Sequence, residues 1–267
     1  MNVVSVTRRD GPIVLGRPHG GTWLPDELLD RLTPRGQGLA DTDWHINRLY
    51  DGLLEGATVV QSNVHRYAID ANRDPAGVSL YPGQNTTTLC PLTDFDGVPI
   101  WKEGQTPSED EILSRRDAYH VPYHAALGAE LERVRALHGV AILFDCHSIR
   151  SEIPFLFEGR LPVFSIGTNG GETCAPAIET ITADLCRSAK GYDCVLNGRF
   201  KGGWTTRHYG RPQDGIHAIQ MELAQRAYLS SEAPPWAFDD RKATRLRAHL
   251  GAILAALSSG DMLESLR

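Results

Sequence analysis

Short apolar runs alternate along the chain with longer segments whose apolar residues recur at helical spacing. The apolar runs predict strands at residues 12–16, 57–61, 139–148, 162–167, 193–197 and 215–223, with extended chain at residues 64–69. Helices are predicted at residues 23–32, 41–54, 108–137, 174–190 and 240–258. Because this alternation shows no linker and no internal repeat, we predict one α/β domain over residues 1–267, with a mixed, mostly parallel sheet flanked by helices.

Local signals refine two of these helices. In residues 41–54, the apolar positions 46, 49, 50 and 53 fall on one face. The helix at residues 108–137 starts with a capping-box pattern, in which Ser108 precedes Glu111 by three residues. Pro122 predicts a kink in that helix because proline lacks the N–H that a regular helix requires.

Residues 74–107 have no helical period and are rich in proline and glycine. The prolines of this segment are Pro75, Pro82, Pro91, Pro99 and Pro107. A loop of this length inside a compact domain is usually functional, so we predict that it borders a site or acts as a lid.

Composition narrows the class of protein. The chain has 267 residues, of which 41% are hydrophobic and 22% charged, so general disorder is excluded. The net charge of −6 does not indicate nucleic-acid binding, which is typical of basic proteins. No apolar stretch has the length of about 18 residues that a membrane span needs. Five cysteines without a CxxC pair, and no apolar segment in the first ten residues, favour a reducing compartment. We expect a soluble cytoplasmic protein.

Polar residues that follow predicted strands suggest a metal site. His19 follows the first strand and His147 lies at the end of the strand at residues 139–148, and ligands bind at such strand ends in α/β proteins. Two histidines and one carboxylate form a common catalytic zinc site. Asp43 is the favoured third ligand because it lies three residues before Ile46, on the inner face of its predicted helix. His45 is a rival ligand, and Asp41 or Asp43 could instead cap the helix.

Further residues surround these candidates. Asp145 precedes His147 by two residues and could orient its ring. His120 and His124 are four residues apart on a predicted helix, but no glutamate of the HExxH type lies between them. We therefore expect His120 and His124 to support the site or face the substrate rather than to bind the metal.

A loop arginine and a strand carboxylate complete the candidate chemistry. The planar guanidinium of Arg73, next to Asn72, suits capture of a carboxylate, although an ion pair with Asp70 or Asp74 is the alternative. Glu222 lies in a predicted strand and could act as a general base, or be an ordinary strand residue. The Gly202-Gly203 pair could let the backbone approach a site closely, or form a surface turn.

Together these motifs resemble the N-formylglutamate amidohydrolase (deformylase) family. Each motif is weak alone, but the ordered set is specific and spans residues 12 to about 228. The matching stretches are Pro18-His-Gly-Gly, Asp41-Thr-Asp-Trp-His, Asp70-Ala-Asn-Arg-Asp-Pro, Asp145-Cys-His-Ser, Phe200-Lys-Gly-Gly-Trp-Thr-Thr-Arg-His-Tyr-Gly and Gln220-Met-Glu-Leu.

The resemblance implies a phosphorylase/hydrolase-like α/β fold related to zinc carboxypeptidases and aspartoacylase. It implies that His19 and His147 bind a divalent metal ion, zinc by preference, and that Glu222 activates the metal-bound water. The Asn72-Arg73 pair matches one that binds a substrate carboxylate in those relatives. The chain departs from them at Thr22, where an HxxE motif would have its glutamate, so the carboxylate ligand is open among Asp43 and its rivals.

The implied reaction is metal-assisted hydrolysis of N-formyl-L-glutamate to formate and L-glutamate, the last step of a histidine-degradation route. The substrate is a small dicarboxylate, so a second cation must hold its other carboxylate. Lys201, Arg207 and Arg66 are candidates for that cation, and His208 is a further candidate for substrate contact.

Three rival interpretations remain at this stage. The enzyme could hydrolyse another N-acyl amino acid, such as an N-acyl-aspartate. A silent metabolite-binding protein of the same fold would lack a convergent site or a metal. A hydrolase without metal could use Cys146 or Ser148 as its nucleophile, and its activity would survive chelation. The identity of the metal and the oligomeric state are not set by the sequence.

Overall fold

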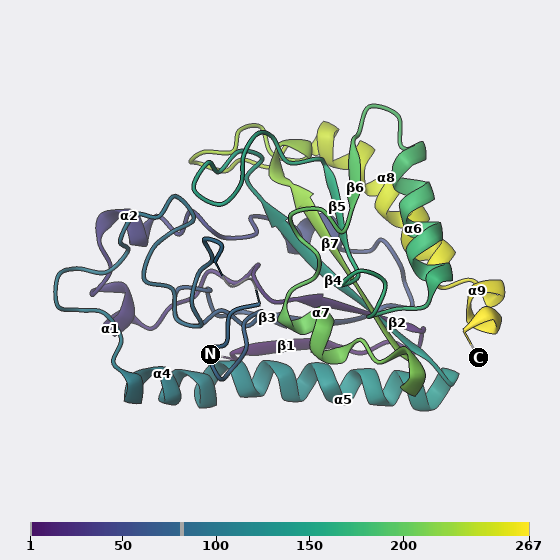
Figure 1. The fold of residues 1–267 in the computed structure, drawn as a ribbon, viewed down its shortest axis with the longest axis horizontal. Coiled ribbons are helices and arrows are strands. Elements are labelled where there is room, and N and C mark those ends of the chain that lie inside the picture. Colours follow the sequence, from purple (N-terminus) through teal and green to yellow (C-terminus); the bar gives the residue numbers. More distant parts are fainter. Residues whose placement is uncertain (1, 81–82, 267) are drawn as a thin grey trace.

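The protein is built on one sheet, which has seven strands in the part of the chain that the computed structural model describes, residues 2–80 and 83–266. These strands are Val4–Thr7 (β1), Ile13–Arg17 (β2), Thr58–Ser62 (β3), Ala141–Ile149 (β4), Phe164–Gly167 (β5), Cys194–Leu196 (β6) and Ile216–Ala224 (β7). Their spatial order is β1-β3-β2-β4-β7-β5-β6 (Figure 1). Strands β3, β2, β4 and β7 are parallel, whereas β1 and β5 run antiparallel to β3 and β7. The predicted mixed, mostly parallel sheet is confirmed.

Two segments differ from the prediction. β1 was not predicted, because it is an edge strand with three exposed residues out of four and carries no apolar run. Residues 64–69 do not form a strand: Val64 makes a single bridge to Trp23, and the chain then turns. The turn closes where the amide of Ala68 donates to the carbonyl of His65 at 3.0 Å.

Helices cover both faces of the sheet. Figure 1 shows α5 along one side and α6 with α8 along the other. The helices are Asp26–Leu29 (α1), Pro34–Gln37 (α2), Ile46–Tyr50 (α3), Glu109–Arg115 (α4), Val121–His138 (α5), Pro176–Ser188 (α6), Trp204–Tyr209 (α7), Asp240–Leu257 (α8) and Gly260–Ser265 (α9). The short helices α2, α7 and α9 were not predicted.

Alternation along β4 divides the core into two layers. Leu143 packs with Leu127 of α5, whereas the next residue, Phe144, belongs to the cluster that contains Leu250 of α8. Successive side chains of a strand point to opposite faces, so Asp145 and His147 project on the side of Leu143. The polar end of β4 therefore lies on the face that α5 covers.

The predicted helix at residues 41–54 is wrong at its start. Only Ile46–Tyr50 is helical, and His45 before it has the left-handed φ of 57°. Asp41 and Asp43 thus lie in a turn rather than on a helix face. Both carboxylates are buried and bind groups from distant segments, which holds this turn in place.

A π turn interrupts the segment at residues 108–138 just before Pro122, where the sequence predicts a kink. The Ser108 hydroxyl accepts a hydrogen bond from the Glu111 amide at 3.3 Å, so the predicted cap of α4 is confirmed. A π turn, Arg116–His120, then joins α4 to α5 directly before Pro122. Because proline cannot donate the regular backbone bond, the wider turn accommodates it at this point.

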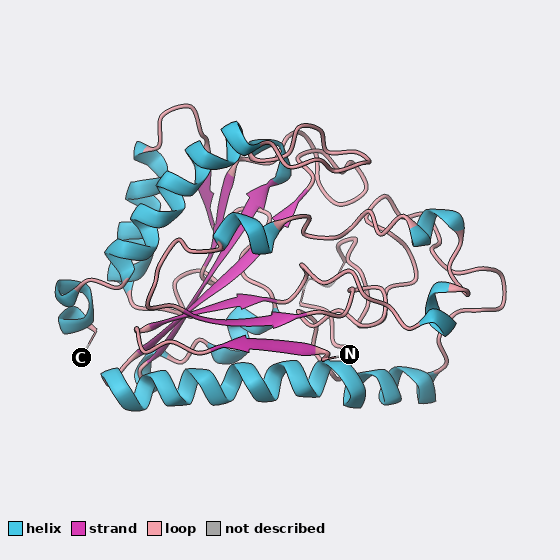
Figure 2. Ribbon diagram, turned by 180° about the vertical axis from the view of Figure 1, so that it is seen from behind, coloured by secondary structure: helices cyan, strands magenta, loops and turns pink. Residues whose placement is uncertain are grey.

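Loops gather at one end of the sheet (Figure 2). Residues 74–80 and 83–107 contain no helix and no strand beyond isolated bridges, as predicted, while Pro82 lies outside the described residues. Among the described helices, none combines the length and the apolar character needed to cross a membrane.

Candidate metal centre and active site

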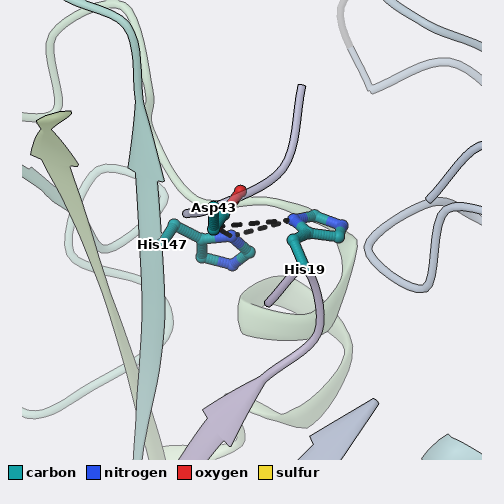
Figure 3. Close-up of side chains that lie close together, drawn as sticks. All are labelled: His19, Asp43 and His147. Atoms are coloured by element: carbon teal, nitrogen blue, oxygen red, sulfur yellow. Dashed lines mark hydrogen bonds and ion pairs between the residues drawn. The ribbon is translucent and has the colours of Figure 1, made fainter. Parts of the chain in front are cut away.

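Three buried side chains converge at the carboxyl ends of the central strands, and they point toward one another in Figure 3. The Nδ1 atoms of His19 and His147 are 3.2 Å apart. Asp43 Oδ2 lies 3.5 Å from the Nδ1 of His147 and 4.0 Å from that of His19. Ligand atoms about 2.1 Å from a tetrahedral zinc ion lie about 3.4 Å apart, so this group fits a divalent metal ion.

Sheet register and one backbone bond bring the three residues together. β2 pairs with β4 so that Gly16 is opposite Asp145, and His19 follows β2 just beyond this pair. The amide of Asp43 donates to the carbonyl of His19 at 3.1 Å, which docks the Asp43 turn beside the strand end. The fold thus positions each residue from a different segment.

A carboxylate lies behind each histidine. His19 Nε2 is 2.7 Å from Asp70 Oδ1, and His147 Nε2 is 3.1 Å from Asp145 Oδ1. Carboxylates in this position fix the tautomer and orientation of metal-binding histidines, here with both Nδ1 atoms toward the centre. The sequence suggested this role for Asp145, but it suggested Asp70 only as an ion-pair partner of Arg73.

Asp43 is held as an anion. Its Oδ1 accepts from Arg66 at 3.2 Å, and its Oδ2 accepts from the Ser148 amide at 2.9 Å. Burial alone would raise the pKa of Asp43, but Arg66 and His147 hold that pKa below its usual value. The ionised form is the one that binds a cation.

The rival third ligands are engaged elsewhere. Asp41 Oδ2 accepts from the Tyr67 hydroxyl and from the Phe95 amide, both at 2.9 Å, and burial raises its pKa to about 7. His45 Nε2 lies 2.9 Å from the carbonyl of Trp236. Neither belongs to the His19, Asp43 and His147 group.

Glu222 stands beside this group because of the sheet register. β4 and β7 pair with His147 directly opposite Glu222, and side chains of paired residues project from the same face. Gln220 donates to Glu222 Oε2 at 3.2 Å. Burial raises the pKa of the Glu222 carboxyl to about 8, against the opposing effect of His147. A carboxyl poised near neutrality can both take up and release a proton.

A pocket opens on the same group. Its lining includes His19, Asn72, His147 and Glu222, together with residues 77–80 and 85–89 of the long loop. The prediction that this loop borders a site agrees with this lining. Its described lining includes three cations: Arg66, Arg73 and Arg199.

Arg73 connects the strand ends to the long loop. Its Nε donates to the Thr87 carbonyl at 2.9 Å and a terminal nitrogen donates to the Thr87 hydroxyl at 2.8 Å. Asp70 is more distant, with 3.7 Å between Arg73 Nη1 and Asp70 Oδ2. The Arg73 guanidinium therefore lies in the pocket wall. It is held mainly by hydrogen bonds to Thr87 of the long loop, and the ion pair with Asp70 is the weaker contact.

His120 and His124 are not among the described residues that line the pocket. Their Nε2 atoms are 3.0 Å from the carbonyl of Arg73 and 2.7 Å from that of Ala71. Burial lowers the pKa of His124 to about 3, so its neutral ring donates this bond. Both histidines support the backbone on either side of Asn72.

Three residues expected to face the substrate do not line the described pocket: Lys201, Arg207 and His208. Arg207 Nε donates to the Gly202 carbonyl at 2.9 Å, and the His208 ring stacks on Trp204. The pocket-lining cation that the sequence did not single out is Arg199, two residues before Lys201. Arg199 directly precedes Phe200, the first residue of the motif at residues 200–210. This position next to the motif was the one sequence feature that could have pointed to Arg199.

The Gly202-Gly203 pair approaches the site rather than forming a surface turn. The Gly203 amide donates to Gln220 Oε1 at 2.7 Å. A Cβ atom on Gly203 would fall 2.2 Å from Asn72 Nδ2. Only glycine fits at this position without moving Asn72, which itself contacts His147 Nε2 at 3.3 Å.

The rival nucleophiles lack activation in the described part of the chain. Cys146 is fully buried, and burial raises the pKa of its thiol well above the usual value, which disfavours the reactive thiolate. The Ser148 hydroxyl accepts from the Tyr228 hydroxyl at 2.7 Å, and no histidine bonds to it.

Comparisons with known proteins show the family of this chain. The family model for N-formylglutamate amidohydrolase matches residues 11–229. The chain is 44% identical over 257 residues to an N-formylglutamate deformylase of Pseudomonas aeruginosa, covering 95% of this chain and 96% of that protein. It is also 44% identical over 247 residues to an N-formylglutamate deformylase of Pseudomonas putida, covering 92% of each.

Solved structures support the fold. A crystal structure of an N-formylglutamate amidohydrolase from Ralstonia eutropha superposes with a TM-score of 0.78 at 24% identity, covering 96% of each chain. A gene product of Agrobacterium tumefaciens gives a TM-score of 0.69 at 18% identity, covering 100% of this chain and 96% of that one. With the match over residues 11–229, these similarities lead to one conclusion: the chain belongs to the N-formylglutamate amidohydrolase family.

Proposed function

We propose that this protein hydrolyses N-formyl-L-glutamate to formate and L-glutamate, with a divalent metal ion, zinc by preference, held by His19, Asp43 and His147. The observation that carries the proposal is the convergence of these three buried ligands at a pocket that three arginines line. An anionic substrate suits such a lining. The names of the relatives supply the identity of the substrate.

In the proposed reaction, the metal ion and Glu222 have separate roles. When bound, a divalent ion polarises the formyl carbonyl and lowers the pKa of a water toward about 7. Glu222 takes the proton of the attacking water and delivers it to the leaving nitrogen, so a single carboxyl serves as base and then as acid. Its position opposite His147 in the sheet register supports this role.

Substrate orientation is assigned to the segment at residues 70–73. We assign one substrate carboxylate to Arg73 and Asn72, which both line the pocket, with Asn72 3.3 Å from His147. His120 and His124 hold the backbone of this segment, and Asp70 and Asp145 orient the metal-binding histidines. Arg66, beside Asp43, adds positive charge where the carbonyl oxygen develops negative charge.

The cellular setting follows from the same proposal. Release of glutamate from its N-formyl derivative fits the last step of histidine degradation, which the family resemblance implies. Five cysteines without a disulfide in the structure suit the reducing cytoplasm. The proposed partner is a small acidic metabolite.

A formate-release assay tests the proposal. The purified protein is assayed with N-formyl-L-glutamate before and after dialysis against a chelator, and again after Zn²⁺ is added back. We expect release of formate, its loss on chelation, and recovery with the metal. Activity that survives complete metal removal would contradict the metal mechanism.

The main rival is another N-acyl amino acid as substrate. N-acetyl-L-aspartate and N-acetyl-L-glutamate in the same assay separate the alternatives. A higher kcat/KM for either acetyl compound than for N-formyl-L-glutamate would overturn the proposed acyl group while leaving the metal site intact.

A further inference from the structure

The three pocket arginines lie at different depths. Arg66 is closest to the metal centre, because it bonds to the ligand Asp43 at 3.2 Å. Arg73 follows Asn72, whose side-chain nitrogen lies 3.3 Å from His147 Nε2. Arg199 bonds to the backbone of Leu156 and Asn85, which form a different part of the pocket wall.

The contacts of Arg199 define that part of the wall. Its Nε donates to the carbonyl of Leu156 at 3.0 Å, and a terminal nitrogen donates to the carbonyl of Asn85 at 3.2 Å. Asn85 is exposed, so this end of the pocket faces solvent. Arg199, Asn85 and Leu156 all line the pocket.

The depth of the arginines matches the order of groups in the proposed substrate. With the formyl carbon at the metal centre, the α-carboxylate carbon lies two bonds from the amide nitrogen, and the γ-carboxylate carbon lies four bonds from it. We propose that Arg199 binds the γ-carboxylate and so selects an acidic side chain, an inference that rests on the proposed function. Arg73 with Asn72 then holds the α-carboxylate.

The environment of Arg199 favours a carboxylate over a neutral amide. Two backbone carbonyls fix the guanidinium, and Phe200 lies beside it with 5.4 Å between the guanidinium carbon and the ring centre. A planar guanidinium held in one orientation binds a carboxylate through charge-assisted hydrogen bonds. An uncharged side-chain amide offers the guanidinium no negative charge and is therefore bound more weakly than a carboxylate.

Three substrates separate the two carboxylate sites. N-formyl-L-glutamine replaces the γ-carboxylate by an amide, and N-formyl-L-isoglutamine replaces the α-carboxylate by an amide. We compare kcat/KM of the wild type, Arg199→Met and Arg245→Met on these compounds and on N-formyl-L-glutamate. Arg245 is an exposed residue of α8, so its substitution removes the same charge away from this pocket.

Arg199→Met should lower kcat/KM for N-formyl-L-glutamate by about 10-fold or more, because the charge-assisted hydrogen bonds to the γ-carboxylate are lost. Its kcat/KM for N-formyl-L-glutamine should stay near the wild-type value, which also shows that the variant is folded. Its preference for N-formyl-L-glutamate over N-formyl-L-isoglutamine should remain. Arg245→Met should match the wild type throughout.

Two results overturn the inference and one tests the proposed function separately. An Arg199→Met protein that keeps the wild-type preference for glutamate over glutamine removes Arg199 from side-chain selection. If Arg199→Met loses all three activities, Arg199→Lys decides: a retained glutamate preference supports the inference, and its loss contradicts it. A wild type that releases formate from none of the compounds refutes the proposed function itself.

Discussion

The hydroxyl of Thr206 donates a hydrogen bond to Asp145 Oδ2 across 2.9 Å, and the other carboxylate oxygen, Oδ1, lies 3.1 Å from His147 Nε2. Thr206 and Asp145 are both fully buried. The short helix α7 therefore reaches the metal centre through its threonine, which fixes the rotation of the carboxylate that in turn orients His147.

Substituting Thr206 should change metal affinity without touching a ligand. Thr206→Val keeps the shape but removes the donor, and we expect zinc affinity to fall by about 10- to 100-fold. Thr206→Ser should restore most of the affinity. Competition with a chromophoric chelator measures the effect independently of turnover.

The neighbouring residue provides the control. Thr205 is also buried, but its hydroxyl has no hydrogen-bond partner in the described structure. Thr205→Val should therefore leave zinc affinity unchanged. Equal losses in Thr205→Val and Thr206→Val would mean that α7 acts through packing rather than through the bond to Asp145.

Glu222→Gln tests the proposed base. Glutamine keeps the shape of the side chain but cannot accept a proton, so formate release should fall by about 10²- to 10⁴-fold. Metal content should stay at the wild-type level because Glu222 lies outside the ligand group. Metal analysis and kcat are measured on the same preparation. Near-normal turnover in a metal-replete variant would move the base to another residue.

Arg73→Ala should weaken substrate binding more than it slows turnover. The loss of one partner of a charge pair costs about 2–5 kcal/mol, which predicts a large rise in KM for N-formyl-L-glutamate. The variant should also lose its preference over N-formyl-L-isoglutamine. If that preference persists, Arg73 only ties Thr87 and Asp70 to each other.

Gly203→Ala should damage the site through a steric contact. The added Cβ would fall 2.2 Å from Asn72 Nδ2, so Asn72 must move. Overpacking of this kind costs about 1–3 kcal/mol of stability, and we expect a lower melting temperature together with slower formate release. Gly260→Ala, where an added Cβ meets nothing within 4 Å, is the matched control.

The features that could be predicted from the sequence are those set by the local pattern of apolar residues, namely the central strands and the polar residues at their ends. Buried runs such as Ala141–Ile149 identify the central strands because a parallel strand is apolar on both faces. His19, His147 and Glu222 could be placed at strand ends for the same reason. The prediction of convergence needed only the rule that parallel strands end at one edge of a sheet.

Contacts between distant segments could not be predicted in this way. Asp43 was favoured for a helical position that it does not occupy, because the left-handed conformation of His45 gives no apolar signal. Asp70 meets His19 across 51 residues of sequence, and no periodicity encodes that pairing. Arg199 has only a neighbouring motif to mark it, and its role in the pocket depends on how the long loop folds.

The two arginines that we assign to the substrate carboxylates also hold the long loop, Arg73 through Thr87 and Arg199 through Asn85. Their side chains therefore lose most of their rotational freedom when the protein folds, before any substrate arrives. An incoming dicarboxylate meets cations that are already oriented, so little further entropy is lost on binding. The long loop thus sets the distance between the two guanidinium groups. A change in the length of this loop would change the distance between the two carboxylates of the dicarboxylate that binds best.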